Sequence, residues 1–124
     1  MSEVTTTFFH GLGERAPELL PRRIHGTIRF DLQRGTETSY WYIAMRHGNM
    51  VVSQDQRDAD CVVHVSEALF DRFTTGEANV ISAMIRTECV LDGDIPLLMM
   101  FRRFFPAAPG AIDPRRMVRE RQSR

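Results

Sequence analysis

The chain has 124 residues, of which 43% are apolar, and its sixteen basic residues balance its sixteen acidic ones to a formal net charge of zero. This length suits one domain with one core, and the longest apolar run falls far short of the roughly 18 residues that a membrane span requires. The N-terminus lacks the basic, apolar and small-residue regions of a signal peptide, so we expect a cytoplasmic protein without a transmembrane segment.

Charge is spread unevenly along the chain. Segment 114–124 carries five arginines and one glutamate, so the remaining residues carry a net negative charge. A basic tail can contact nucleic acid or an anionic lipid surface, but a solvated, frayed terminus is the commoner case. We therefore expect no nucleic-acid partner, although transient membrane contact stays open, and we divide the chain into a domain at 1–106 and a flexible Arg-rich tail at 107–124.

The first 23 residues show only weak helical patterning. Ser2 can cap a short helix, which Gly11 and Gly13 would end. A second helical turn fits 16–20, before Pro21. We expect two short helical pieces here, docked on the rest of the domain.

Alternation of apolar and polar residues predicts strands in the next part of the chain. It runs through 24–32 and 39–46, and a tight turn at 47–49 leads into a short third strand at 50–53. A fourth strand follows at 60–66, after a polar loop. One apolar and one polar face are typical of a sheet with one solvated side.

Helical periodicity follows the fourth strand. Ser66 can cap a helix that Gly76 ends, a second helix fits 77–86, and a fifth strand fits 87–91. This order indicates an α+β fold, a single domain with about five mainly antiparallel strands covered by helices. Because the fifth strand follows a helical crossover, a parallel pairing is permitted there.

Segment 94–105 is the most apolar stretch of the chain. Asp94 can cap a helix there, Pro96 is tolerated in the first turn, and Pro106 ends the segment. A surface helix normally shows one apolar stripe, whereas this one is apolar on nearly every side. It therefore needs a second apolar neighbour besides the core, which can be a partner subunit, a membrane surface or a bound apolar ligand.

The sequence carries no pattern of a catalytic or metal site. There is no nucleophile elbow or phosphate-binding loop, and the acidic loop 55–60 lacks the glycine and final glutamate of a calcium loop. His64 with Asp60 or Glu88 could form an acid/base group, yet the alternation places Asp31, His64 and Glu88 on the outward face. We expect no catalytic residue, metal or cofactor, and we expect a non-enzyme.

The two cysteines, Cys61 and Cys89, lie in apolar strand-like runs. They are too few for a disulfide framework and lack metal-type spacing. We expect buried free thiols.

Four pieces, in this order and spacing, resemble the sterol carrier protein 2 family of lipid-binding domains over roughly residues 8–105. They are Gly26–Leu32 with the Trp41 strand and the Gly48 hairpin, Ala59–Ser66, Phe73–Asn79 and Leu91–Asp94. The chain departs from the family at Thr87, where a glycine often opens the fifth strand, and at Arg102-Arg103 within the last helix.

The resemblance implies an apolar tunnel between sheet and helices that holds a fatty acyl chain, an acyl-CoA or a sterol, and it implies carriage in place of catalysis. The apolar residues that we expect to line the tunnel are Trp41, Phe70, Phe73, Ile81, Met84, Leu98, Met99, Phe101 and Phe105. We also expect Arg102 or Arg103 at the tunnel mouth, where it would meet an anionic headgroup.

Two other readings stay open. In the first, the same fold is a structural or interaction domain whose tunnel is filled by its own side chains and whose 94–105 helix forms a homodimer. This reading can coexist with lipid carriage, where the resemblance makes the inner face of that helix the lid of the tunnel, and we expect a subunit contact on its outer face. The inner face would be Ile95, Leu98, Met99 and Phe105, and the outer face Leu97, Met100 and Phe104. In the second, the chain is a small enzyme of the cone-shaped isomerase or dehydratase kind, which the outward position of Asp31 and His64 argues against.

Overall fold

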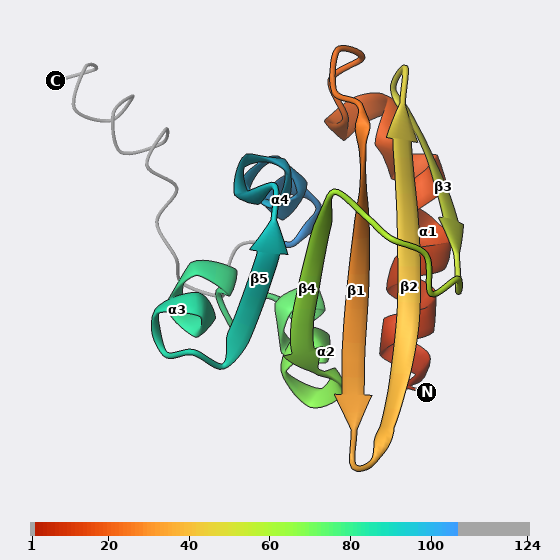
Figure 1. Cartoon of the computed structure of the whole chain (residues 1–124). Coiled ribbons are helices and arrows are strands. Elements are labelled where there is room, and N and C mark those ends of the chain that lie inside the picture. Colours follow the sequence, from red (N-terminus) through yellow and green to blue (C-terminus); the bar gives the residue numbers. More distant parts are fainter. Residues whose placement is uncertain (1, 107–124) are drawn as a thin grey trace, which may run out of the picture.

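The computed structural model describes residues 2–106, which form one five-stranded sheet with helices packed against one of its faces (Figure 1). The elements are α1 (Glu3–Leu19), β1 (Gly26–Arg34), β2 (Glu37–Arg46), β3 (Asn49–Ser53), β4 (Cys61–Ser66), α2 (Glu67–Thr75), α3 (Val80–Ile85), β5 (Cys89–Gly93), α4 (Ile95–Phe101) and a 3₁₀ turn η1 (Arg102–Phe104). The expected α+β class is confirmed. The tail expected at 107–124 lies outside the described residues.

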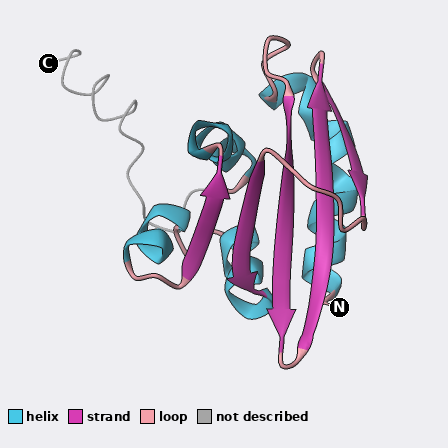
Figure 2. Ribbon diagram, viewed as in Figure 1, coloured by secondary structure: helices cyan, strands magenta, loops and turns pink. Residues whose placement is uncertain are grey.

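The strand order is β3-β2-β1-β4-β5, with β1 at the centre. Antiparallel pairing joins β1 to β2, β2 to β3 and β4 to β5, whereas β1 and β4 run parallel. The expected position of the parallel pairing was therefore wrong, because the chain crosses the sheet earlier, in the loop 54–60 between β3 and β4 (Figure 2). After α2 and α3 the chain returns beside β4 in the opposite direction.

The N-terminal segment is one continuous helix, and the expected division into two pieces was wrong. Ser2 caps α1 as predicted, since its Oγ accepts from the Thr5 N–H at 3.0 Å. A glycine inside a helix costs only about 1 kcal/mol. The side chains of Phe9, Leu12 and Ala16, spaced three or four residues apart on one helix face, are fully buried. Their burial outweighs the helix-breaking tendency of the intervening glycines.

Thr87 occupies a left-handed backbone conformation, with φ +59°. It ends the α3 turn, where its N–H donates to the Met84 carbonyl at 3.1 Å and the Glu88 N–H donates to the Ala83 carbonyl at 2.9 Å. A β-branched residue at positive φ is strained, whereas glycine adopts this conformation freely. A glycine, which the sequence resemblance leads us to expect at this point, would therefore fit the geometry better.

We expect Thr87→Gly to stabilise the domain by about 0.5–1 kcal/mol, because relief of strain exceeds the added chain entropy of the unfolded state. Urea unfolding followed by circular dichroism measures the change. Thr74→Gly, a substitution in the last turn of α2, is the matched control and should destabilise by about 1 kcal/mol. Equal losses at the two positions would contradict the assignment of strain to Thr87.

The C-terminal helix is shorter than expected, because the α-helical hydrogen bonding of α4 gives way to the 3₁₀ turn η1. In a 3₁₀ turn residues i and i+3 eclipse, so Phe104 lies over Phe101, with ring centroids 5.2 Å apart. Phe104 and Leu97, expected on an outer face, are therefore buried in the chain's own core, whereas Ile95 is 45% exposed. The division of this helix into inner and outer faces was wrong at these three residues.

Candidate functional site

An aromatic layer fills the space between the sheet and the helices. It draws residues from α1, β1, β2, α2 and the C-terminal segment, and its members are Phe8, Phe9, Phe30, Trp41, Phe70, Phe73, Phe101, Phe104 and Phe105. At its centre three rings are nearly parallel: Phe9 stacks on Trp41 with centroids 4.5 Å apart and on Phe70 at 5.1 Å. Such pairs add to the stabilisation from burial alone.

The edge of the aromatic layer is formed by Phe8 and Phe105, which are both partly buried. Their rings stack at 5.2 Å, so the first helix and the last described segment meet here. Phe8 also borders a groove of about 380 Å³ between α1 and α2, lined by Glu3, Val4, Thr7, Phe8, Thr74 and Thr75. The aromatic layer is therefore close to the surface at this edge.

The structure brings most of the predicted lining residues together. Trp41, Phe70, Phe73, Leu98 and Phe101 are buried in one core cluster, and Met84, Met99 and Phe105 are partly buried against it. Ile81 is 36% exposed on α3 and is absent from that cluster. Four members of the aromatic layer were missing from the predicted set, namely Phe8, Phe9, Phe30 and Phe104. The continuous helical spacing of α1 is the signal that would have included the first two.

Trp41 combines complete burial with an unpaired polar atom. Its side chain is 1% exposed, and within residues 2–106 its Nε1–H has no hydrogen-bond partner. Indole N–H groups normally find a partner when they are buried, and leaving one unpaired costs about 1–3 kcal/mol.

The two arginines of η1 contact groups of their own chain. The Arg102 Nη1 lies 3.9 Å from the Met99 sulfur, and the Arg103 Nη1 donates to the Leu19 carbonyl at 3.2 Å. The second contact is favourable because Leu19 ends α1, where helix carbonyls carry partial negative charge. Among the described residues, neither arginine forms an ion pair with an acidic side chain.

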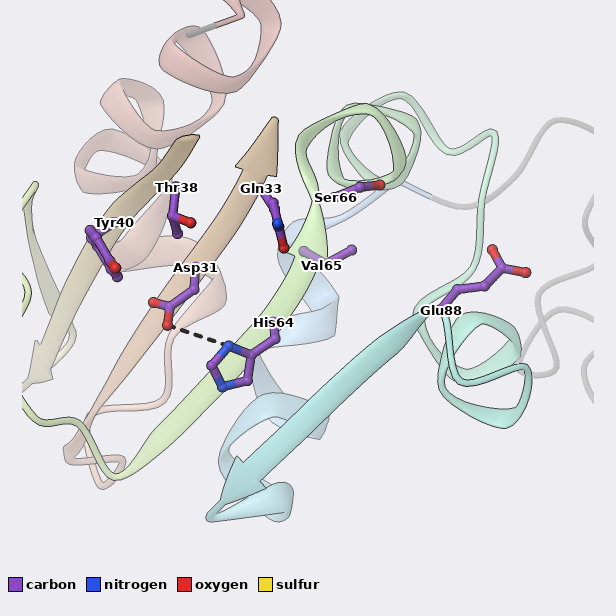
Figure 3. A pocket seen from close by; sticks show the side chains of 8 residues that line it. All are labelled: Asp31, Gln33, Thr38, Tyr40, His64, Val65, Ser66 and Glu88. Carbon is purple, nitrogen blue, oxygen red and sulfur yellow. Dashed lines mark ion pairs between the residues drawn. The ribbon is translucent and has the colours of Figure 1, made fainter. Parts of the chain in front are cut away.

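The opposite face of the sheet carries a separate polar cluster around Asp31. Both carboxylate oxygens of Asp31 accept from the Arg29 guanidinium, at 2.7 and 2.9 Å, and His64 Nδ1 lies 3.4 Å from Oδ2 (Figure 3). The parallel register places His64 beside Asp31, so its neighbouring acid is Asp31 and not Asp60 or Glu88, the two partners considered for an acid/base group. Asp60 instead accepts from the Thr27 N–H at 2.9 Å.

This cluster borders an open hollow of about 380 Å³, and the eight lining side chains are those labelled in Figure 3. Asp31 is buried, and its charge is neutralised by Arg29, whose own pKa is raised by the hydrogen bond to Asp31 against the opposing effect of burial. Two charge-assisted hydrogen bonds hold the Asp31 carboxylate against Arg29 on the same strand. The cluster therefore joins β1 to β4 and shows no feature that requires catalysis.

Cys61 and Cys89 are buried free thiols, as predicted. Burial raises the pKa of each thiol to about 11. Since the thiolate is the reactive form, we expect a chromogenic disulfide reagent at pH 8 to label neither cysteine in the native protein and both after unfolding in urea.

The raised thiol pKa values also set a pH dependence. The thiols stay protonated in the folded state and ionise near the usual pKa when unfolded, so their contribution to stability is complete below about pH 8.5 and is lost as pH rises through about 11. The double variant with alanine at both positions should show a smaller fall over this range. An equal fall would contradict the assignment to the thiols.

Within the described residues, no group of three histidine, cysteine or acidic side chains is placed to hold a metal ion. No helix among those same residues has the length and apolar content to cross a membrane.

Comparisons with known proteins match this architecture. The model of the SCP-2 sterol transfer family matches residues 12–106. A peroxisomal multifunctional enzyme A from Dictyostelium discoideum is 26% identical over 98 residues, which are 77% of this chain and 22% of that enzyme. The chain therefore spans less than a quarter of the length of that curated relative.

Solved structures share the fold at low sequence identity. A sterol carrier protein 2 from Aedes aegypti, in complex with palmitate, has a TM-score of 0.66 and 19% identity over 86% of this chain and 100% of its own. A double mutant of the sec-alkyl sulfatase PisA1 has a TM-score of 0.70 and 16% identity over 91% of this chain, but only 18% of that protein.

A mixed five-stranded sheet, covered on one face by helices over an aromatic layer, defines a small α+β domain of the sterol-carrier type. The matched segment covers most of the chain. The chain belongs to the SCP-2 sterol transfer family.

Proposed function

We propose that this chain binds an apolar lipid, such as a fatty acyl chain, an acyl-CoA or a sterol, between its sheet and its helices, and carries it without catalysis. The observation that supports this most is the aromatic layer, whose edge at Phe8 and Phe105 adjoins a groove. Family membership agrees with it, and one structural relative is described as a complex with palmitate. A cytoplasmic location stays a prediction.

The physical chemistry of the aromatic layer suits such a ligand. Burial of apolar surface stabilises by about 25 cal/mol per Å², so a few hundred Å² of acyl chain are ample for micromolar affinity after ordering costs. Met84 and Met99 lie partly buried beside the layer, and unbranched thioethers re-pack readily around ligands of varied shape. Entry requires rearrangement at the edge, where Phe105 follows the last helical turn and its ring contacts those of Phe8 and Phe70.

The sharpest test is lipid binding by the wild-type chain and by Phe105→Ala. We expect mass spectrometry of natively purified protein to show a bound lipid, and we expect palmitate to displace a fluorescent fatty acid. Loss of the Phe105 ring should weaken palmitate binding by about five- to tenfold, because one wall of the entry is removed.

Ile85→Ala is the matched control, since Ile85 is 78% exposed on α3 and is absent from the core cluster. It should leave the affinity unchanged. A lipid-free mass together with no displacement of the fluorescent probe would refute lipid binding.

The proposed headgroup site at Arg102 and Arg103 can be tested with the same assay. Neutralising Arg103 with glutamine should weaken palmitate but not the uncharged alcohol of the same length, because only the carboxylate gains from the cation. Equal effects on both ligands would remove the headgroup proposal and leave lipid binding in place.

The alternative is a structural or interaction domain that binds no ligand. The complete burial of Phe9, Phe70 and Phe101 favours it, since the domain's own rings fill the layer. Its proposed homodimer through segment 94–105 has less apolar surface available than expected, with Ile95 exposed and Met99 and Met100 partly buried. Sedimentation equilibrium distinguishes the readings: a dimer at all concentrations without lipid binding would support the alternative.

A further inference from the structure

We propose that the preferred ligand of the aromatic layer is a lipid with an uncharged oxygen acceptor, which receives a hydrogen bond from Trp41 Nε1. This inference rests on the proposed function and deepens it by naming the chemical class of the ligand. It starts from an observation in the described chain: within residues 2–106, Trp41 Nε1 is the buried side-chain N–H donor without a partner.

A chain of aromatic contacts links Trp41 to the surface groove. Phe8 borders the groove and meets Phe70 with ring centroids 5.6 Å apart. Phe70 stacks on Phe9, which in turn stacks on Trp41. A ligand that displaces these rings would therefore reach the indole of Trp41, whose Nε1 is the unpaired donor.

The chemistry of that atom selects the ligand. An indole N–H is a donor only, so its partner must be an acceptor. A carboxylate would lose its water there at far greater cost than a neutral oxygen. The rings around Trp41 supply no buried cation, because Phe9 is neutral and His10, which meets the indole edge-on at 6.0 Å, is exposed. A ketone, ester carbonyl, ether or hydroxyl oxygen of the lipid can therefore accept from Nε1. A charged lipid headgroup would remain in water at the protein surface.

The chain offers a direct readout, because Trp41 is its single tryptophan and its indole N–H gives one resonance in ¹H–¹⁵N NMR spectra. We compare a long-chain ketone with the alkane of equal length, using the wild-type protein. The ketone should move the indole proton downfield and should bind about five- to tenfold more tightly than the alkane, since only the ketone satisfies the donor.

Trp41→Phe removes the N–H and keeps an aromatic ring. In this variant the affinity ratio of ketone to alkane should fall close to one, while alkane binding is retained. Tyr42→Phe is the matched control, because Tyr42 is the next residue of β2 on the opposite face of the sheet, under Arg57. It loses one hydroxyl and should keep the wild-type ratio.

The outcomes separate the two levels of the proposal. An indole resonance that responds equally to ketone and alkane, or a ratio that Trp41→Phe leaves intact, would overturn the acceptor inference and leave lipid binding standing. Palmitate that shifts the resonance as strongly as the ketone would overturn the exclusion of a charged end. Failure of both ligands to bind, with no displacement of a fluorescent fatty acid, would remove the proposed function and this inference with it.

Discussion

Gly93→Ala is expected to destabilise the domain by at least about 3 kcal/mol, because an added Cβ would have no room and the backbone conformation disfavours it. Gly93 ends β5 with φ +106°, and an ideal Cβ there would lie 2.1 Å from the Asp60 carbonyl oxygen. That carbonyl cannot move freely, since it accepts from the Asp94 N–H at 2.8 Å. The clash therefore involves two backbone segments and no flexible side chain.

Gly35→Ala provides the matched control for this prediction. Gly35 also has positive φ, at +61°, but a Cβ there meets nothing within 4 Å. Alanine at this turn should cost only about 1 kcal/mol, the penalty of the left-handed conformation itself. Urea unfolding of both variants measures the difference. A similar fall in the free energy of unfolding of both would show that the close contact with the Asp60 carbonyl is not the cause.

Phe70→Ala is expected to cost about 3–5 kcal/mol, the range for removing a large aromatic ring from a packed core. Phe70 is fully buried at the centre of the aromatic layer and makes ring contacts with Phe8, Phe9, Phe30 and others. The contacting rings come from α1, β1, α2 itself and the segment after η1, so truncation leaves a cavity that these packed elements close only in part.

The same variant links stability to the proposed function. A cavity at Phe70 lies next to Phe8 and Phe105, so bound palmitate should restore stability in Phe70→Ala more than it stabilises the wild type. Thermal unfolding with and without palmitate measures this. Ile85→Ala, at an exposed position, should stay within about 0.5 kcal/mol of wild type and show no added rescue. If palmitate stabilises Phe70→Ala no more than the wild type, the ligand does not bind in the aromatic layer.

Local patterns in the sequence predicted most of the elements. Alternation along β1 and β2 reflects one buried and one solvated face, which is a property of each strand by itself. The caps at Ser2, Ser66 and Asp94 are short-range contacts, and each accepts from an N–H three residues later, as expected. The burial of both cysteines follows equally from their apolar neighbours.

The candidate site was only partly predictable, because its members meet through long-range packing. Phe8 and Phe105 are far apart in sequence but stack on one another, and no periodicity links them. Phe9 lies within the first predicted helix, but its burial shows as one face only with Leu12 and Ala16, after Gly11, and packing on the sheet decides that α1 continues that far. Likewise, Ile81 follows a helical pattern, but α3 is short and leaves it partly exposed.

The sequence by itself therefore determined the α+β class, the positions of the strands, the helix caps and the apolar character of segment 94–105, because these depend on neighbours within a few residues. Only the tertiary structure decided that β1 pairs parallel with β4, which brings Asp31 to His64. It also decided that a 3₁₀ turn carries Phe104 into the core, and that within residues 2–106 the Trp41 N–H has no partner. Each of these features depends on which distant segments of the chain pack together in the core, and short-range sequence patterns do not carry that information.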